Sequence, residues 1–187
     1  MPKVNFVQAR KAYPQFGIDK GERHFVWTLK TGPRSSSTFR QKEQPKPWQL
    51  TSSPYLQQAY RLEHQAAEFS GDADDLGTMI DEIDTLRDEA QQSLDNMPES
   101  LQMGPTGELL EERTSMCDEA LATLEDAKSD LEEALDEPDE PSRDDFDDGD
   151  DGDDEYETAL DDYNNEVADK RGAADEAREQ VHDLSLT

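Results

Sequence analysis

Basic and aromatic side chains gather in the first 48 residues, and together they are suited to binding nucleic acid. This segment holds ten of the 18 Lys and Arg residues, three of the 47 acids, seven of the thirteen aromatics and both tryptophans. Cations neutralise phosphates, and exposed rings stack on the bases of single strands. The residues predicted to do so are five bases and two tryptophans: Lys30, Arg34, Arg40, Lys42, Lys46, Trp27 and Trp48.

The same aromatics have a second interpretation as a small core. Apolar and polar residues alternate over 24–30, which is the period of a half-buried strand. Turn residues follow at 31–34, and 35–40 can return as a second strand. Two strands alone are marginal in water, so the apolar face needs a third element or a partner. In this interpretation Phe25, Trp27 and Phe39 hold the hairpin to the first helix.

The acidic run 138–155 partly matches a calcium loop. With Asp144 at position 1, Asp148, Asp150 and Glu155 occupy positions 5, 7 and 12 of an EF-hand. Phe146 at position 3 offers no side-chain oxygen, and a tract this rich in aspartate produces partial matches by chance. We therefore expect weak, diffuse cation binding at Asp144, Asp148, Asp150 and Glu155, and no cofactor.

No arrangement of catalytic residues is visible. The sequence lacks GxSxG, GxxxxGK[ST] and GxGxxG motifs, so nothing supports acyl transfer, nucleotide hydrolysis or dinucleotide binding. His24, His64 and His182 have no metal-binding spacing, and the single cysteine excludes CxxC pairs. We expect a protein that is not an enzyme.

Four segments have the apolar periodicity of helices, roughly 54–70, 72–96, 107–137 and 156–184. The third has Leu110, Cys117, Leu124 and Leu131 at seven-residue spacing, which is a helix-pairing seam. The short link 99–106 favours an antiparallel hairpin within the chain. The same seam can instead pair two chains as a homodimer.

The sequence thus predicts a mostly α protein: an antiparallel helical hairpin with a small N-terminal β-hairpin head and a disordered acidic tract. Its parts are a basic aromatic head (1–48), a helical body (49–137), an acidic disordered linker (138–155) and a C-terminal helix (156–187). No apolar run has the length of a signal peptide or a membrane span, so we expect a cytoplasmic protein without a membrane partner.

Several short runs resemble small accessory proteins encoded by tailed bacteriophages. The resemblance covers roughly residues 1–125 and implies a phage gene working in the cytoplasm of a bacterial host. It brings no catalytic residue with it. The runs that carry it lie at 9–14 (ARKAYP), 17–22 (GIDKGE), 47–53 (PWQLTSS), 96–102 (NMPESLQ) and 106–113 (TGELLEER).

Charge separates the chain into opposite parts and leaves three functional hypotheses. The net charge is −29: residues 1–48 hold ten bases against three acids, and residues 49–187 hold eight bases against forty-four acids. The first hypothesis is a non-enzymatic binding protein whose head contacts nucleic acid or an anionic surface, while the acidic tail competes or recruits a basic partner. The second is an acidic nucleic-acid mimic that inhibits a host DNA-handling or defence protein. The third is a structural protein pairing through the heptad helix. A halophilic host would also explain such acidity.

Overall fold

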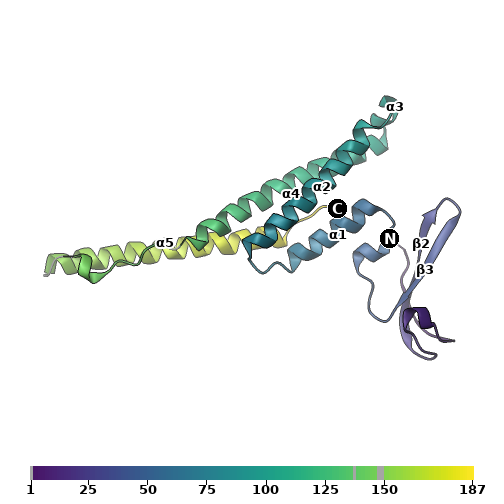
Figure 1. Cartoon of the computed structure of the whole chain (residues 1–187), viewed down its shortest axis with the longest axis horizontal. Coiled ribbons are helices and arrows are strands. Elements are labelled where there is room, and N and C mark those ends of the chain that lie inside the picture. The colour runs from purple at the N-terminus through teal and green to yellow at the C-terminus, as the bar shows by residue number, and fades with distance from the viewer. Residues whose placement is uncertain (1, 137, 147–149) are drawn as a thin grey trace. The chain divides into compact units, whose positions relative to one another are not determined.

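The chain is mostly helical with a small antiparallel sheet, as the sequence predicts (Figure 1). The computed structural model describes residues 2–136, 138–146 and 150–187, with the backbone alone for 150–152. The chain divides into two compact units, which we call the head (residues up to His64, with Thr187) and the helical unit (Gln65–Leu186). The first of the longer helices, α1 (Pro54–Ala67), crosses that division.

The head is built on a three-stranded antiparallel sheet in the order β1-β2-β3. Strands β2 (Arg23–Gly32) and β3 (Ser35–Gln41) form the predicted hairpin, with Trp27 opposite Phe39. Strand β1 (Asn5–Gln8) is an element that the sequence pattern did not predict. All four of its residues are exposed, so they lack the alternation that marks a half-buried strand. It supplies the third element that an isolated hairpin needs.

The interior of the head depends on a few large side chains. Trp27 is 3% exposed and stacks on Phe39 with ring centroids 5.6 Å apart. Its Nε1–H donates to the carbonyl of Gln49, 2.9 Å away, in the 3-10 turn η2 (Pro47–Leu50). Ile18 is also buried, in the loop around the 3-10 turn η1 (Pro14–Phe16). Trp27 thus belongs to a small core, as the second interpretation expects, whereas Phe39 covers the Trp27 ring from the surface and is itself 37% exposed.

Two long helices lie side by side in the helical unit (Figure 1). They are α2 (Ala73–Asp95) and α4 (Pro105–Leu135), joined through the single turn α3 (Glu99–Gln102). Gly77 lies beside Lys128 and Arg87 beside Asp118, so the two helices run antiparallel. Helix α2 begins where the sequence predicts, because Asp72 caps it by accepting the N–H of Asp74 at 3.0 Å.

The predicted helix-pairing residues are buried within one chain. Leu110, Cys117, Leu124 and Leu131 are each 9% exposed or less. Helix α4 lies against both α2 and α5 (Asp150–His182), and these helices cover its apolar stripe. A second copy of the chain would find little apolar area left on this seam.

Helix α5 begins earlier than the predicted 156, at Asp150. Its second half packs antiparallel to the end of α4, burying Ala174, Ala177 and Val181, and Lys170 Nζ donates to the carbonyl of Asp136 at 2.6 Å. The predicted disorder over 138–155 is not confirmed. The described part of that tract contains the 3-10 turn η3 (Arg143–Asp145) and the first residues of α5.

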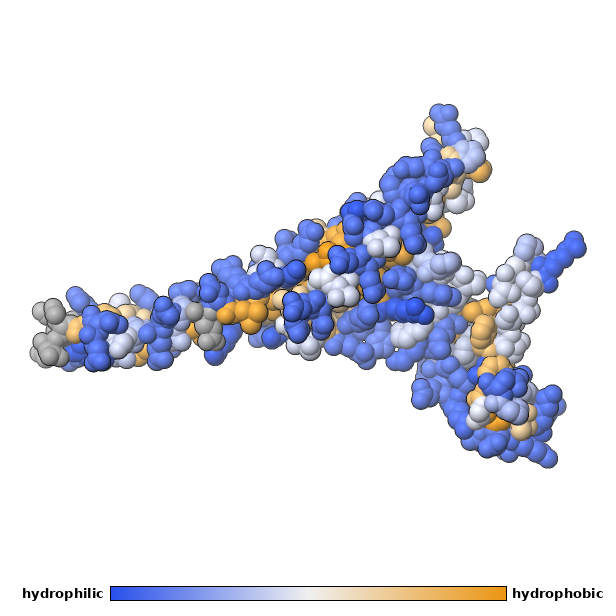
Figure 2. All heavy atoms as spheres, in the orientation of Figure 1, coloured by the Kyte–Doolittle hydropathy of each residue, from blue (hydrophilic) through white to orange (hydrophobic). Residues whose placement is uncertain are grey.

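Carboxylates dominate the outer surface of these helices. In Figure 2 hydrophilic residues cover most of the visible surface of the helical unit, and hydrophobic residues follow the seam between helices. Helix α4 has ten acids against two bases. Among the helices that the structure describes, none is long and apolar enough to cross a membrane.

Candidate functional site

The sheet of the head places Trp27 and Arg40, two of the predicted nucleic-acid contacts, on opposite faces. Directly paired residues of antiparallel strands share a face, and neighbours in sequence alternate. Trp27 pairs with Phe39 and lies on one face, which we call the aromatic face. Val26 pairs with Arg40, so Arg40 lies with His24 on the other face, which we call the basic face. Trp27 and Arg40, which were predicted to act together on a single strand, are therefore separated by the sheet.

Burial removes Trp27 from the predicted nucleic-acid contacts. At 3% exposure it has no ring face open to a base, because Phe39 stacks on it and its N–H is bonded to Gln49. Trp48 is half-buried and remains at the surface of a hollow of about 390 Å³ on the aromatic face. The ring of Trp48 lies 5.1 Å from that of His64.

The five predicted bases do not form one patch. Lys30 and Arg34 lie exposed at the β2–β3 turn, whereas Arg40 lies at the other end of β3. Lys30 lies six positions along β2 from His24, which is about 20 Å in an extended strand. Lys46 Nζ lies 2.9 Å from His64 Nε2, close to Trp48. The candidate contacts are therefore spread over two ends of the hairpin.

Within the described part of the chain, Lys42 is the one predicted base that has a carboxylate partner. Its Nζ donates to Glu22 Oε1 at 3.0 Å, and the backbone N–H of Asp19 donates to Glu22 Oε2 at 2.7 Å. The Asp19 bond is the larger cause, and Lys42 the second, of a pKa for the Glu22 carboxyl below its ordinary value. This carboxylate fixes the turn before β2 and occupies Lys42.

A cluster of three side chains on the basic face was not predicted. His24 is 1% exposed, and Arg40 Nη1 donates to its Nε2 at 3.0 Å. The Arg40 guanidinium also lies over the ring of Tyr13, 4.3 Å from its centroid. From its spacing in the sequence, His24 is predicted to be an ordinary polar residue without a functional partner. Only strand register brings it next to Arg40, sixteen positions away.

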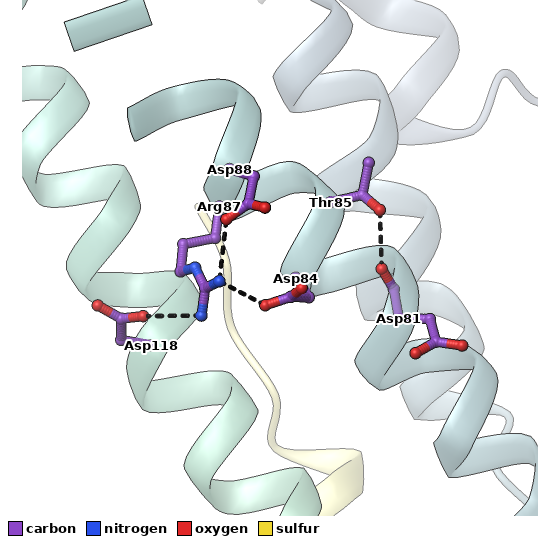
Figure 3. Close-up of polar contacts among 6 residues, drawn as sticks. All are labelled: Asp81, Asp84, Thr85, Arg87, Asp88 and Asp118. Carbon is purple, nitrogen blue, oxygen red and sulfur yellow. Dashed lines mark hydrogen bonds and ion pairs between the residues drawn. The ribbon is translucent and has the colours of Figure 1, made fainter. Parts of the chain in front are cut away.

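In the helical unit, one cation holds three carboxylates (Figure 3). Arg87 of α2 lies 2.6 Å from Asp84, 2.9 Å from Asp88 and 3.6 Å from Asp118 of α4. The hydrogen bond to Asp88, followed by the charges of Asp84, Asp88 and Asp118, raises the pKa of Arg87 above its ordinary value. Arg87 therefore joins α2 to α4 electrostatically where acid is dense.

The predicted cation ligands lie only in part within the described chain. Asp148 and the side chain of Asp150 lie outside it. Asp144 lies in η3 and Glu155 in α5. Arg143 of the same tract donates to Asp153 at 2.6 Å. In the described ranges no three His, Cys, Asp or Glu side chains are placed so that they could hold a metal ion.

The basic surface of the head and the acidic surface of the helices are the candidate binding regions of this chain. No protein-family model, no curated protein and no solved structure matches the chain.

Proposed function

We propose that this chain is a non-enzymatic binding protein whose head contacts nucleic acid through its phosphates. One observation carries the proposal. Of the ten bases in residues 1–48, only Lys42 has a carboxylate within ion-pair distance in the part of the chain that the structure describes. Unpaired cations attract a polyanion without first breaking an internal ion pair.

Because Trp27 is buried and cannot stack on a base, the proposed contact relies mainly on charge. Binding that relies on charge rather than on stacked bases is sequence-independent and depends steeply on salt. Trp48, which is half-buried, is the remaining tryptophan that can add a stacking contact.

Fluorescence anisotropy of labelled single-stranded DNA and RNA tests the proposal. We expect affinity for the full-length protein to fall steeply between about 50 and 200 mM salt. Replacing two exposed bases, Lys30→Gln with Arg34→Gln, should reduce the slope of log affinity against log salt by about 1.4, because each single-strand phosphate contact contributes about 0.7. Absence of binding at the lower salt concentration would remove the proposal.

In the same proposal, the acidic helices either compete with nucleic acid for the basic head or recruit a basic partner. Deleting residues 138–187 is a poor test, because Ala177 and Val181 of α5 are buried in the helical unit. Neutralising exposed acids of α5 keeps that packing: Glu157→Gln, Asp161→Asn and Asp162→Asn. Competition predicts tighter binding of single-stranded DNA by this variant, and an unchanged affinity would exclude it.

A second candidate is an acidic mimic of nucleic acid that occupies the site of a DNA-handling or defence protein. Mimicry needs carboxylates on regular structure, and α2, α4 and α5 carry them in helices. A pull-down from bacterial lysate separates the candidates. A basic DNA-handling enzyme captured through the helical unit supports mimicry, whereas co-purifying nucleic acid supports binding by the head.

We also propose, from the resemblance to phage accessory proteins, that the protein works in the cytoplasm of an infected bacterium. The alternative of a structural protein that pairs through the heptad seam has less support, since Cys117 and Leu124 are fully buried within one chain. A mass measurement in solution at moderate salt tests it, and a dimer that persists on dilution would restore it.

A further inference from the structure

A hollow of about 690 Å³ opens on the basic face of the sheet. It lies between the start of β2, the end of β1 and the loop that contains Tyr13. Three cations line it, Arg10, Lys20 and Arg40, together with the buried His24. No aspartate or glutamate side chain is among the described residues around it. The hollow is therefore positively charged and lacks an internal counterion.

Arg40 is held in a fixed position in this hollow. A guanidinium only donates hydrogen bonds, so its contact with His24 makes Nε2 the acceptor and leaves the imidazole proton on Nδ1. Nδ1 faces the carbonyl of Glu22, 3.5 Å away. The Tyr13 ring supports the other side of the contact. Two neighbours thus orient the planar guanidinium before any ligand arrives.

Most of the hydrogen-bonding capacity of the hollow is unused. Arg40 has five N–H donors, and His24 accepts one. In the described chain neither Arg10 nor Lys20 has a carboxylate partner. The nearby Glu22 carboxylate is engaged by Lys42 and Asp19. Three like charges around one hollow repel each other, and a bound anion would remove that repulsion.

We propose that this hollow is a phosphate site that recognises the charge of a phosphate group and not the base attached to it. A guanidinium fork fits two phosphate oxygens, and a lysine adds a point charge. Tyr13 contacts the cations Arg40 and Lys11, and this favours an ionic role over stacking. This inference rests on the proposed function and names the place where one phosphate of a strand binds.

Two double variants of the full-length chain test the site. Arg10→Gln with Lys20→Gln removes two exposed pocket bases, and Lys30→Gln with Arg34→Gln removes two exposed bases at the distant turn. Both change the net charge equally. Inorganic phosphate, titrated at constant ionic strength, should shift the NMR signals of the Arg40 Nε–H and of the His24 ring. The pocket variant should bind phosphate at least about tenfold more weakly, and the turn variant within about twofold of the parent.

The proposal is overturned if those two signals do not move, or if both double variants weaken phosphate binding equally. Arg40→Lys adds a third measurement. Lysine keeps the positive charge but lacks the paired N–H donors of the guanidinium. Phosphate affinity should therefore fall, while the other resonances of the sheet stay in place. An unchanged affinity would contradict recognition by the guanidinium.

Oligonucleotides separate this inference from the proposed function. If single-stranded DNA binds and Arg10→Gln with Lys20→Gln leaves its affinity unchanged, the head binds nucleic acid and the phosphate site is wrong. If phosphate binds in the hollow and no oligonucleotide binds, the site is right and the nucleic-acid function is wrong. A preference for a strand with a 5′-phosphate over one with a 5′-hydroxyl assigns the site to a strand end, and equal affinity assigns it to the backbone.

Discussion

The head and the helical unit use their cations in opposite ways. In the helical unit at least five of the seven bases lie within 4.0 Å of a carboxylate: Arg87, Lys128, Arg143, Lys170 and Arg178. In the described part of the first 48 residues, one base of ten does so. Cations in the helical unit reduce repulsion among acids, whereas those of the head are available to a ligand. The contrast separates charge that serves the fold from charge that can serve binding.

The two regions also differ in how their interiors are made. The head depends on a few large rings, with Trp27 at the centre. The helical unit buries a long series of smaller residues, among them Leu76, Ile83 and Leu124. Since both tryptophans lie in the head and most of the helix lies outside it, tryptophan fluorescence and far-UV circular dichroism report the two regions separately. The following substitutions use that separation.

Trp27→Ala should have the largest effect and should be confined to the head. Truncating a buried tryptophan costs about 3–5 kcal/mol, which is a large share of the stability of a small domain. Denaturation followed by the fluorescence of Trp48 should show the loss, and circular dichroism should show a nearly unchanged helical transition. Phe16→Ala, at a ring that is 37% exposed, serves as control and should cost much less.

Leu124→Ala should destabilise the helical unit by about 2–5 kcal/mol, because its side chain is fully buried in the seam. Leu135→Ala makes the same change at a side chain that is 76% exposed and should stay within about 0.5 kcal/mol. Urea denaturation followed by circular dichroism compares them. Equal losses would show that the seam is not the core of this unit.

Gly107→Ala and Gly172→Ala should change stability in opposite directions. A Cβ at Gly107 would overlap the carbonyl of Gln102, where the link passes the start of α4, so we expect a loss of about 1–3 kcal/mol. Among the residues that the structure describes, no atom lies within 4 Å of a Cβ at Gly172 in α5, and alanine there should add about 0.5–1 kcal/mol by helix propensity. Thermal unfolding followed by circular dichroism measures both changes in stability. A gain in stability for Gly107→Ala would contradict the close approach of Gln102 to the start of α4.

Arg87→Gln should cost about 1 kcal/mol at low salt and less at high salt, because three carboxylates lose their shared cation. Arg171→Gln is the matched control, since that base has no carboxylate partner in the described chain. Urea denaturation at low and high sodium chloride measures both. A loss at Arg87 that is independent of salt would indicate packing by the side chain rather than charge.

The smallest effect should come from Glu22. Its folded pKa is below the ordinary value, so its stabilisation is fully present above the unfolded pKa of about 4.3 and is lost as pH falls through the folded pKa. Glu22→Gln should therefore be slightly less stable than the parent at neutral pH and should converge with it in acid. Fluorescence-detected denaturation across pH checks this. Glu43→Gln, which removes an exposed carboxylate of the head that has no ion pair in the described chain, is the matched control.

Local chemistry in the sequence determined most of the helix and hairpin positions. The carboxylate of Asp72 opens α2, and Pro54 opens α1 at the predicted residue. Alternation over 24–30 with turn residues at 31–34 predicted the hairpin that forms. These signals lie within a few residues of the element that they specify, so they can be read without knowing the rest of the chain.

Only the tertiary structure decided the face on which Arg40 lies and the partners of the α4 seam. Continuing the pairing of Gly32 with Ser35 along the hairpin would set Arg40 opposite Trp27, on the aromatic face. An irregularity between Lys30 and Gly32 shifts the register by one residue and sets Arg40 opposite Val26, beside His24. The heptad spacing of the α4 seam is likewise compatible with a partner helix from the same chain or from another chain, and the fold pairs it within one chain. Both choices depend on contacts between distant residues, and no local periodicity contains that information.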